Sequence, residues 1–170
     1  MIIENVTFDG YDSKVCIVMR GIPGSFKSTM AKYLASRCGL LEESIENNSF
    51  YYKDLATNKI VSARHSTDQY HMIDGEYKWK AENAGKYHSM NYKAFRDSCE
   101  LGISLVICDN TNITTAESKK YVETAKHNGY IVSICAMDIP TLGEAIERNQ
   151  HNVPKETIHK MRQRLLDTNK

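Results

Sequence analysis

Short apolar runs recur along the chain, separated by longer segments with helical spacing. The runs have strand length, contain β-branched residues and end in polar or turn residues, which is typical of buried strands. They occupy residues 14–19, 60–66, 103–108 and 130–135. The pattern therefore predicts four buried strands.

The segments between these runs carry apolar residues at helical spacing or helix-capping signals. A helix is expected over residues 86–100, and its stripe comprises His88, Tyr92, Phe95 and Cys99. Other helices are expected from residue 28 to Gly39, from the capping boxes at Thr114 and Thr141, and from Pro154. Residues 40–60 fit neither pattern and indicate an insertion or a hairpin.

Strands that alternate with helices imply a mainly parallel sheet with right-handed crossovers and helices on both faces. The predicted fold class is an α/β three-layer sandwich, and residues 1–170 form a single domain. The site of such a sheet lies at the carboxyl ends of its strands. Asp68 and Asp109, which follow two of the strands, are therefore candidates for chemistry.

Composition and charge narrow the class of protein further. Lys and Arg total 22 and Asp and Glu total 21, which excludes a globally basic nucleic-acid coat but leaves room for a local basic groove. The chain start lacks the basic region of a signal peptide, and no apolar run reaches membrane-span length. We expect a soluble, cytoplasmic protein without membrane contact, whose five cysteines are reduced core thiols because none forms a Cys-x-x-Cys pair.

A glycine-rich turn follows the first strand and opens the first helix. A phosphate-binding loop needs inward-facing amides, glycines beside the phosphates, a lysine for the β and γ oxygens, and a hydroxyl for magnesium. The residues predicted to bind nucleotide on this pattern are Gly21, Gly24, Ser25, Phe26, Lys27, Ser28 and Thr29. The helix N-terminus that follows also favours an anion, so the sequence predicts a P-loop.

Phe26 departs from this pattern, because the residue just before the lysine is normally glycine. Glycine permits positive φ and close approach of a ligand, which a bulky ring can prevent. Either the ring turns outward and the loop still binds nucleotide, or binding is impaired and the domain has another role. The intact lysine, hydroxyl and helix favour retained binding.

Three further motifs follow the loop: Ser66-Thr-Asp-Gln-Tyr70, Cys108-Asp-Asn-Thr-Asn112, and Arg148-Asn149 with Val153-Pro154. With the loop, they resemble the 5′-hydroxyl polynucleotide kinases of the bacteriophage T4 type, and within that group the kinase domain of the NEDD4-binding protein 2 family. The similarity runs from about residue 14 to residue 166. The loop is common to many kinases, whereas the last two motifs are more specific.

The resemblance implies a P-loop kinase with a helical lid that transfers the γ-phosphate of ATP or another NTP, with Mg²⁺, to the 5′-hydroxyl end of DNA or RNA. It makes Asp68 the general base, and Lys27 and Arg148 the catalytic cations on the donor phosphates. Ser28 and Asp109 become the metal ligands. From the residues alone, Asp68 is better read as a turn residue, a turn residue is the minor alternative for Asp109, and Arg148 would ordinarily be a solvated helix residue.

The acceptor side departs from the T4 pattern. T4-type enzymes carry an arginine three residues after the base, where this chain has His71, and the second lid arginine is also missing. The predicted acceptor-binding residues are His71, Tyr70, His88 and Thr111. Tyr77 and Trp79 are further aromatics near this side on which bases can stack, and core packing is the alternative for all of these rings.

Two other functions stay open at this point. Near-zero net charge and His71 favour phosphorylation of a nucleoside, nucleotide or other small hydroxyl compound, and Phe26 favours a non-catalytic nucleotide-binding module. No phosphatase or ligase signature accompanies the kinase motifs. A role in nucleic acid repair therefore implies a separate ligase or phosphatase.

Overall fold

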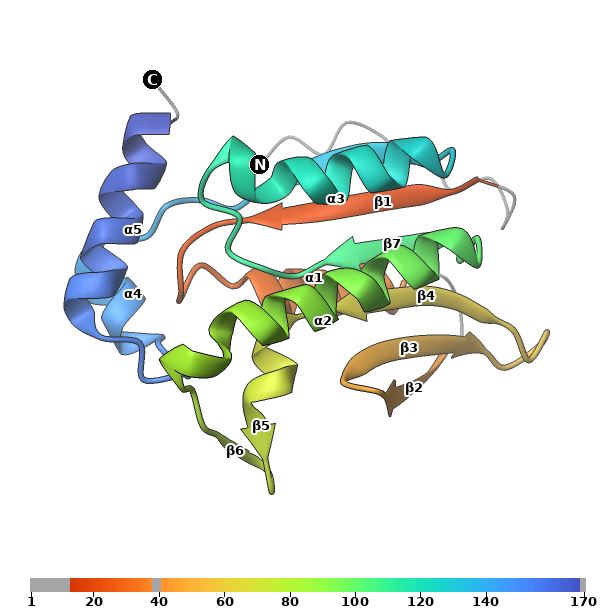
Figure 1. Ribbon diagram of the computed structural model, residues 1–170, viewed down its shortest axis with the longest axis horizontal. Coiled ribbons are helices and arrows are strands. Elements are labelled where there is room, and N and C mark those ends of the chain that lie inside the picture. The colour runs from red at the N-terminus through yellow and green to blue at the C-terminus, as the bar shows by residue number, and fades with distance from the viewer. Residues whose placement is uncertain (1–12, 38–40, 169–170) are drawn as a thin grey trace.

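The computed structural model describes residues 13–37 and 41–168, which fold around a central sheet (Figure 1). The described residues form a six-stranded sheet with the order β2-β3-β4-β7-β1-β8. Its strands are β1 (Val15–Arg20), β2 (Leu41–Glu46), β3 (Ser49–Asp54), β4 (Ile60–His65), β7 (Leu105–Cys108) and β8 (Ile131–Ala136). β4, β7, β1 and β8 are parallel, whereas β2 and β3 are antiparallel additions at one edge. The predicted mainly parallel α/β sheet is thus confirmed.

Helices cover both faces of the sheet. They are α1 (Lys27–Ala35), α2 (Ala81–Glu100), α3 (Thr115–His127), α4 (Leu142–Glu147) and α5 (Lys155–Thr168). The expected capping boxes at Thr114 and Thr141 are both formed, and α5 begins directly after Pro154. Two helices differ in their bounds. α2 begins at Ala81, before the expected residue 86, because its exposed first turns carry no apolar stripe. α1 ends at Ala35, before the expected Gly39.

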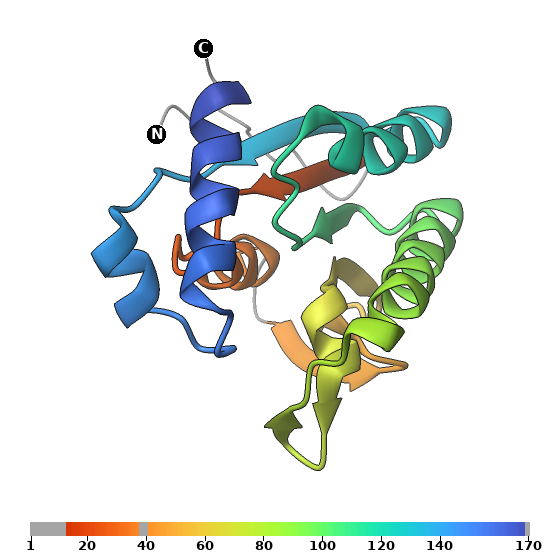
Figure 2. The same cartoon turned by 60° about the vertical axis from the view of Figure 1, so that its left-hand side comes forward.

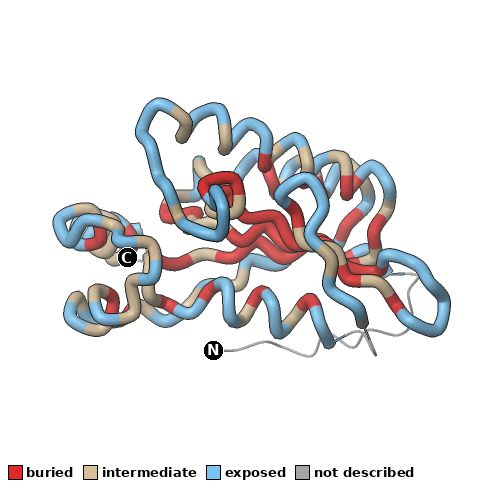
Figure 3. Tube along the Cα trace, turned by 90° about the horizontal axis from the view of Figure 1, so that it is seen from below, coloured by how far each residue is buried: buried red, intermediate tan, exposed pale blue. Residues whose placement is uncertain are grey.

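Successive residues of the parallel strands point to opposite faces and build two cores. Under α2 and α3 the buried residues include Cys16, Val18, Val106, Phe95 and Tyr121. Under α1 they include Val15, Ile17, Met19, Ala31 and Ala35. Figure 3 shows the buried residues concentrated in the central strands, between helices whose outer surfaces are exposed. Burial on both faces explains why β1 and β7 read as continuous apolar runs. The prediction of a fourth buried strand is wrong, because β8 lies at the edge of the sheet and is largely exposed.

Two hairpins extend this framework. The segment 40–60 contains the β2–β3 hairpin, whose turn residues Asn47 and Asn48 both have positive φ. A second, unpredicted hairpin pairs β5 (Met72–Ile73) with β6 (Glu76–Tyr77) through Asp74 and Gly75, which also have positive φ. Asn, Asp and Gly favour this backbone in two-residue turns. The second hairpin follows a 3₁₀ helix, η1 (Thr67–His71), and projects below the sheet in Figure 1.

Helices α4 and α5 form a separate pair near the carboxyl ends of the strands (Figure 2). They share a third core, which is made of Ile22, Ile113, Ala145, Ile158 and Leu165. Since this core includes a residue of the glycine-rich loop and one of the loop after β7, it fastens the helical lid to the site.

Cys16, Cys99 and Cys108 are buried free thiols and Cys135 is half-buried. Burial raises the pKa of Cys108 to about 12, so this thiol stays protonated at neutral pH. The expectations that concern the chain start, Cys38 and Gly39 lie outside the described residues. No helix in the described part of the chain is long and apolar enough to cross a membrane.

Candidate active site

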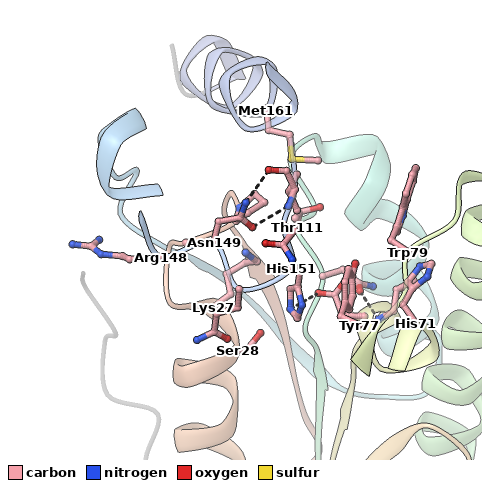
Figure 4. Close-up of a pocket in the computed structure, with 18 of the residues that line it drawn as sticks. Lys27, Ser28, His71, Tyr77, Trp79, Thr111, Arg148, Asn149, His151 and Met161 are labelled. Atoms are coloured by element: carbon pink, nitrogen blue, oxygen red, sulfur yellow. Dashed lines mark hydrogen bonds and ion pairs between the residues drawn. The ribbon is translucent and has the colours of Figure 1, made fainter. Parts of the chain in front are cut away.

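The carboxyl ends of the central strands meet at a cavity of about 570 Å³ (Figure 4). Its walls come from the loop after β1, the segment after β4, the loop after β7 and the α4–α5 connection. Most of the residues predicted from the sequence line it: Gly24, Phe26, Lys27, Ser28, Thr29, Asp68, His71, His88, Asp109, Thr111 and Arg148. Gly21, Ser25 and Tyr70 are absent from this lining.

The two glycines of the loop are needed for the packing of the loop itself, and not only for the approach of a ligand. Gly24 has a φ of 78°, and a Cβ there would lie 2.7 Å from the carbonyl oxygen of Ala145 in α4. A Cβ on Gly21 would lie 2.5 Å from Ser25 Oγ. Because no side chain fits at either place, the loop can approach both the lid and itself closely.

Lys27 lies across the loop with its side chain buried. Its Nζ donates a hydrogen bond of 2.8 Å to the carbonyl oxygen of Ile22. Burial lowers the pKa of Lys27, and the nearby carboxylate of Asp109 partly offsets this effect. Ser25 Oγ is also buried and has no hydrogen-bond partner within the described residues. Both groups are donors to which a phosphate oxygen can offer an acceptor, so the loop fits a phosphate.

Phe26 adopts the left-handed conformation that glycine usually takes here, with φ 63° and ψ 21°. Its ring is 55% exposed, so it turns outward rather than into the loop. The guanidinium of Arg148 lies 4.8 Å from the ring centroid, and its Nη2 donates to Glu144 Oε1 at 3.0 Å. Figure 4 shows Arg148 extended away from Lys27. The lid arginine is therefore held against Phe26 and Glu144.

Asp109 is buried at the end of β7 and pairs with an arginine that the sequence analysis missed. Arg64 Nη1 donates to Asp109 Oδ2 at 2.9 Å, and its guanidinium lies 3.7 Å from the ring centroid of Phe50. A signal existed, because an arginine inside a buried strand requires a buried partner.

The second oxygen of this carboxylate, Asp109 Oδ1, is buried and has no partner in the described part of the chain. Magnesium is commonly held by one or two protein oxygens together with water and phosphate oxygens. Asp109 Oδ1 and the exposed hydroxyl of Ser28 line the same cavity and fit that demand. Among the described residues, no cluster of three or more His, Cys, Asp or Glu forms a metal cage.

The Asp-Asn-Thr-Asn motif after β7 connects the two walls of the cavity. The Asn110 side chain accepts a hydrogen bond of 3.0 Å from the backbone N–H of Thr67, next to Asp68. The Thr111 carbonyl accepts from the N–H of Gly21 at 2.9 Å, and the Asn112 side chain donates to the Met19 carbonyl at 2.8 Å. These bonds fix the position of the η1 segment relative to the glycine-rich loop.

Asp68 is half-exposed on η1 and lies between the hairpin and the lid. The Tyr77 hydroxyl donates to Asp68 Oδ1 at 3.1 Å, and His151 Nε2 lies 3.7 Å from Oδ2. The rings of Tyr77 and His151 contact each other at a tilt of 35°, with centroids 4.2 Å apart. Burial and the Asp68 carboxylate raise the pKa of Tyr77. The candidate base thus accepts a hydrogen bond from the hairpin while the lid imidazole lies close by.

Comparison with known proteins identifies the relatives of this fold and site. The profile of the AAA domain family matches residues 16–167. Human NEDD4-binding protein 2 is 31% identical over 156 residues, which is 89% of this chain but 8% of that protein. The chain belongs to this AAA domain family and is P-loop polynucleotide kinase-like.

Solved structures of the same fold come from complexes of Pnkp1, Rnl and Hen1. One, described as an RNA repair complex, superimposes with a TM-score of 0.63 at 18% identity and covers 95% of this chain and 47% of its own. A second has a TM-score of 0.55 at 17% identity and covers 87% of this chain and 43% of its own. The kinase-like domain therefore spans less than half the length of these proteins and a small part of the human relative.

One predicted acceptor residue of the kinase-like domain is not at the cavity. Tyr70 is buried against Tyr87, with ring centroids 5.9 Å apart, and does not line the cavity. The reason is the geometry of η1, because side chains three residues apart share one side of a 3₁₀ helix. Asp68 and His71 share the side that faces the cavity, which turns Tyr70 away.

The two histidines predicted to contact acceptor both line the cavity, in different environments. His71 is buried, and burial lowers its pKa although Asp68 opposes the shift. His88 is exposed on α2, has a pKa lowered mainly by partial burial, and its Nδ1 lies 3.2 Å from Thr67 Oγ1. Neither imidazole reproduces the fixed positive charge of an arginine.

The Arg-Asn and Val-Pro motif shapes the lid of the kinase-like domain. The Asn149 side chain donates to the Val153 carbonyl at 2.8 Å and accepts from the Val153 N–H at 3.2 Å. Asn149 therefore closes the loop that carries His151 over the cavity. The two bonds to Val153 thus give the asparagine of the Arg-Asn motif a structural role in the lid.

Proposed function

We propose that this domain transfers the γ-phosphate of ATP or another NTP to the 5′-hydroxyl end of a nucleic acid, DNA or RNA. The observation that carries the proposal is that Lys27, from the glycine-rich loop, and Asp68, from η1, line the same cavity. A phosphate held at the loop and a hydroxyl beside the carboxylate would share a single chamber. Membership of a polynucleotide kinase-like family supports the same reaction.

We call the side of the cavity formed by the glycine-rich loop, Asp109 and Arg148 the donor wall. It carries the groups that bind phosphate and metal. Lys27 would exchange its hydrogen bond to the Ile22 carbonyl for the donor phosphates, and the loop amides would surround them. Ser28 and Asp109 would hold Mg²⁺, which neutralises charge on the phosphates. Arg148 reaches the phosphates only after leaving Glu144 and Phe26, so donor binding would compete with that contact.

We call the side formed by η1, Tyr77, Trp79, His88 and His151 the acceptor wall. It supplies the general base. Asp68 would accept the proton of the 5′-hydroxyl while the hydroxyl oxygen forms a bond to the γ-phosphorus. The bond from that phosphorus to the bridging oxygen breaks, and the diphosphate leaves. The Tyr77 hydroxyl orients the carboxylate through Oδ1. The other oxygen, Oδ2, lies nearer His151 and the lid.

A small hydroxyl compound is a second candidate acceptor. Among the described residues that line the cavity, Lys27 and Arg148 are the only Lys or Arg, and both belong to the donor wall. An acceptor wall without fixed positive charge does not require a polyanion. This observation favours a nucleoside or a nucleotide as an alternative to a nucleic acid end.

Radiolabel transfer separates these candidates. The protein is incubated with Mg²⁺ and ATP labelled at the γ-phosphate, together with 5′-hydroxyl DNA, 5′-hydroxyl RNA, nucleosides or nucleotides. We expect label on the 5′ ends of oligonucleotides, and none when the end already carries a phosphate. Exclusive labelling of small molecules would overturn the nucleic acid proposal, and absence of ATP binding by calorimetry would leave only a non-catalytic role.

We also infer that a ligase or phosphatase activity outside the kinase motifs completes any repair reaction. Solved neighbours of this fold occur in an assembly described as an RNA repair complex. That occurrence supports a repair partner for this domain.

A further inference from the structure

The two walls of the cavity differ in the groups that they offer to a ligand. The donor wall has Lys27 and Arg148, whereas the described residues of the acceptor wall include imidazoles but no lysine or arginine. The three imidazoles belong to His71, His88 and His151. Burial lowers the pKa of His71 and His88, so neither is a strong cation at neutral pH. Phosphates of an acceptor would find little fixed positive charge here.

The acceptor wall is instead rich in ring faces. Trp79 follows β6, lines the cavity and keeps 57% of its surface exposed. Next to it, the His71 ring is tilted by 37° relative to the Trp79 ring with centroids 6.4 Å apart, and it lies 4.8 Å from the Tyr87 centroid. Figure 4 shows Trp79 on the same side of the cavity as His71 and Tyr77, across from Ser28 and Arg148. A large, exposed ring thus lies at the cavity beside a buried imidazole.

An aromatic face of this kind binds nucleobases whatever their sequence. Stacking of a base on such a ring is worth about 1–3 kcal/mol per base, which corresponds to roughly 5- to 150-fold in affinity. By contrast, each phosphate that a protein neutralises adds to the salt dependence of binding. Among its described residues, the acceptor wall has aromatic rings but no lysine or arginine, which favours recognition by base stacking over recognition by phosphate neutralisation.

We propose that Trp79, beside His71, is the stacking platform for a base at the 5′ end of the acceptor, so that this domain selects a base-bearing 5′-hydroxyl nucleotide by stacking on its base rather than by binding its phosphates. This rests on the proposed function. It implies that the first nucleotides of an acceptor carry nearly all of its affinity. It also implies that strand length and the identity of the base matter little.

The chain offers a direct probe, because Trp79 is its only tryptophan. Its fluorescence is measured while a 5′-hydroxyl hexathymidylate, or the same strand with abasic residues at its first two positions, is added. We expect quenching by the complete strand and at least fivefold weaker quenching by the abasic one. Between 50 and 200 mM salt, the midpoint should move by less than about threefold, the effect of one phosphate contact. Quenching that ignores the missing bases would overturn the proposal.

Kinetics with variants give a second test. Trp79→Ala should raise the acceptor KM by about 5- to 150-fold without weakening ATP binding, and Trp79→Phe should restore most of the loss. Abasic ends should cost the wild type the same factor but leave Trp79→Ala unaffected, as a shared interaction requires. Tyr33→Ala, which removes an exposed ring from α1, is the matched control and should change nothing. Equal losses of Trp79→Ala on both acceptors would contradict stacking.

The outcomes also separate this proposal from the proposed function. Base-dependent quenching without label transfer would support the platform and overturn the kinase activity. Label transfer without base-dependent quenching would support the kinase activity and overturn the platform.

Discussion

The donor and acceptor walls of the cavity are built in opposite ways. On the donor wall, Lys27 and Asp109 are buried, and each is tied to the fold by a hydrogen bond to a neighbour. On the acceptor wall, Asp68 and His151 are part-exposed, and they meet across the gap between the hairpin and the lid. The donor wall belongs to the core of the sheet, whereas the acceptor wall belongs to additions at its rim.

This difference shows which groups the stability of the fold depends on. Buried charges need their partners, because an unpaired charge in the interior is costly, so changes on the donor wall affect stability as well as chemistry. Half-exposed groups can lose a partner to water at little cost. Half-exposed side chains of the acceptor wall, such as Asp68 and His151, can therefore change without loss of the fold.

The largest effect is expected from breaking the buried pair on the donor wall. Arg64→Ala leaves Asp109 buried without its guanidinium and should lower the free energy of unfolding by about 3–5 kcal/mol. Urea unfolding measures this loss. Arg96→Ala is the matched control, because it removes an exposed pair with Glu100 and should cost well under about 1 kcal/mol. Similar losses of unfolding free energy for the two variants would show that the buried pair contributes no more to stability than the exposed one.

On the acceptor wall, the same kind of change should affect rate instead. Asp68→Asn should leave the unfolding free energy and ATP affinity nearly unchanged while phosphoryl transfer falls by about 10²-fold or more, the usual scale for a general base. Lys27→Ala should instead weaken ATP binding and rate together. Calorimetry and single-turnover transfer measure the two quantities. Asp74→Asn, in the exposed hairpin turn, is the control, and wild-type transfer by Asp68→Asn would rule out this base.

The donor wall could be predicted from the sequence because its signals are local. The apolar run of β1, the glycines and Lys27 adjoin one another, and the capping boxes at Thr114 and Thr141 each fit within four residues. Both hairpins also had local signals, Asn47-Asn48 and Asp74-Gly75, which the apolar pattern alone does not weigh.

The contacts of the acceptor wall could not be predicted, because they join residues far apart in the chain. Asp68 meets His151 only after the lid has packed, and nothing near either residue specifies the other. Nothing near Arg64 in the sequence specifies Asp109 as its partner either, although an arginine in a buried strand indicates that it has some partner. Tyr70 does not line the cavity, because its orientation depends on the turn geometry of η1, which the sequence pattern does not reveal. Local pattern thus predicts elements, whereas tertiary packing decides pairs.

A smaller effect concerns β4, the strand that leads to Asp68. His65 is fully buried between Ser49 and Ser98, each 3.0 Å from one ring nitrogen, and burial lowers its pKa from 6.5 to about 3. The folded state keeps this ring neutral while the unfolded state gains a proton below pH 6.5. Its contribution to stability is therefore complete above pH 6.5 and is lost as the pH falls toward 3.

Between pH 6.5 and pH 5, this linkage should remove about 2 kcal/mol of stability. Urea unfolding at several pH values measures the slope. His65→Asn, if folded, should lack this part of the slope, whereas the exposed His159→Asn on α5 should keep it. Parallel curves for wild type and His65→Asn would assign the acid sensitivity to other groups.

The smallest effect is expected within the donor wall, at Phe26 and Arg148. A residue other than glycine in the left-handed region costs about 1 kcal/mol, and an exposed cation and ring contribute about 0.5–1 kcal/mol. Phe26→Ala removes the ring but keeps the strained backbone, so its unfolding free energy should fall slightly. Phe26→Gly removes both and should recover about that amount relative to alanine.

Nucleotide affinity then tells whether the ring matters to the donor wall. Because the ring faces outward, its removal opens no space for phosphate, and any gain must come from an Arg148 released toward the donor. Both variants should therefore bind ATP a few-fold more tightly and to the same extent, as measured by calorimetry. Tighter binding by Phe26→Gly alone would instead show that the backbone conformation, rather than the hold on the lid arginine, restrains the loop.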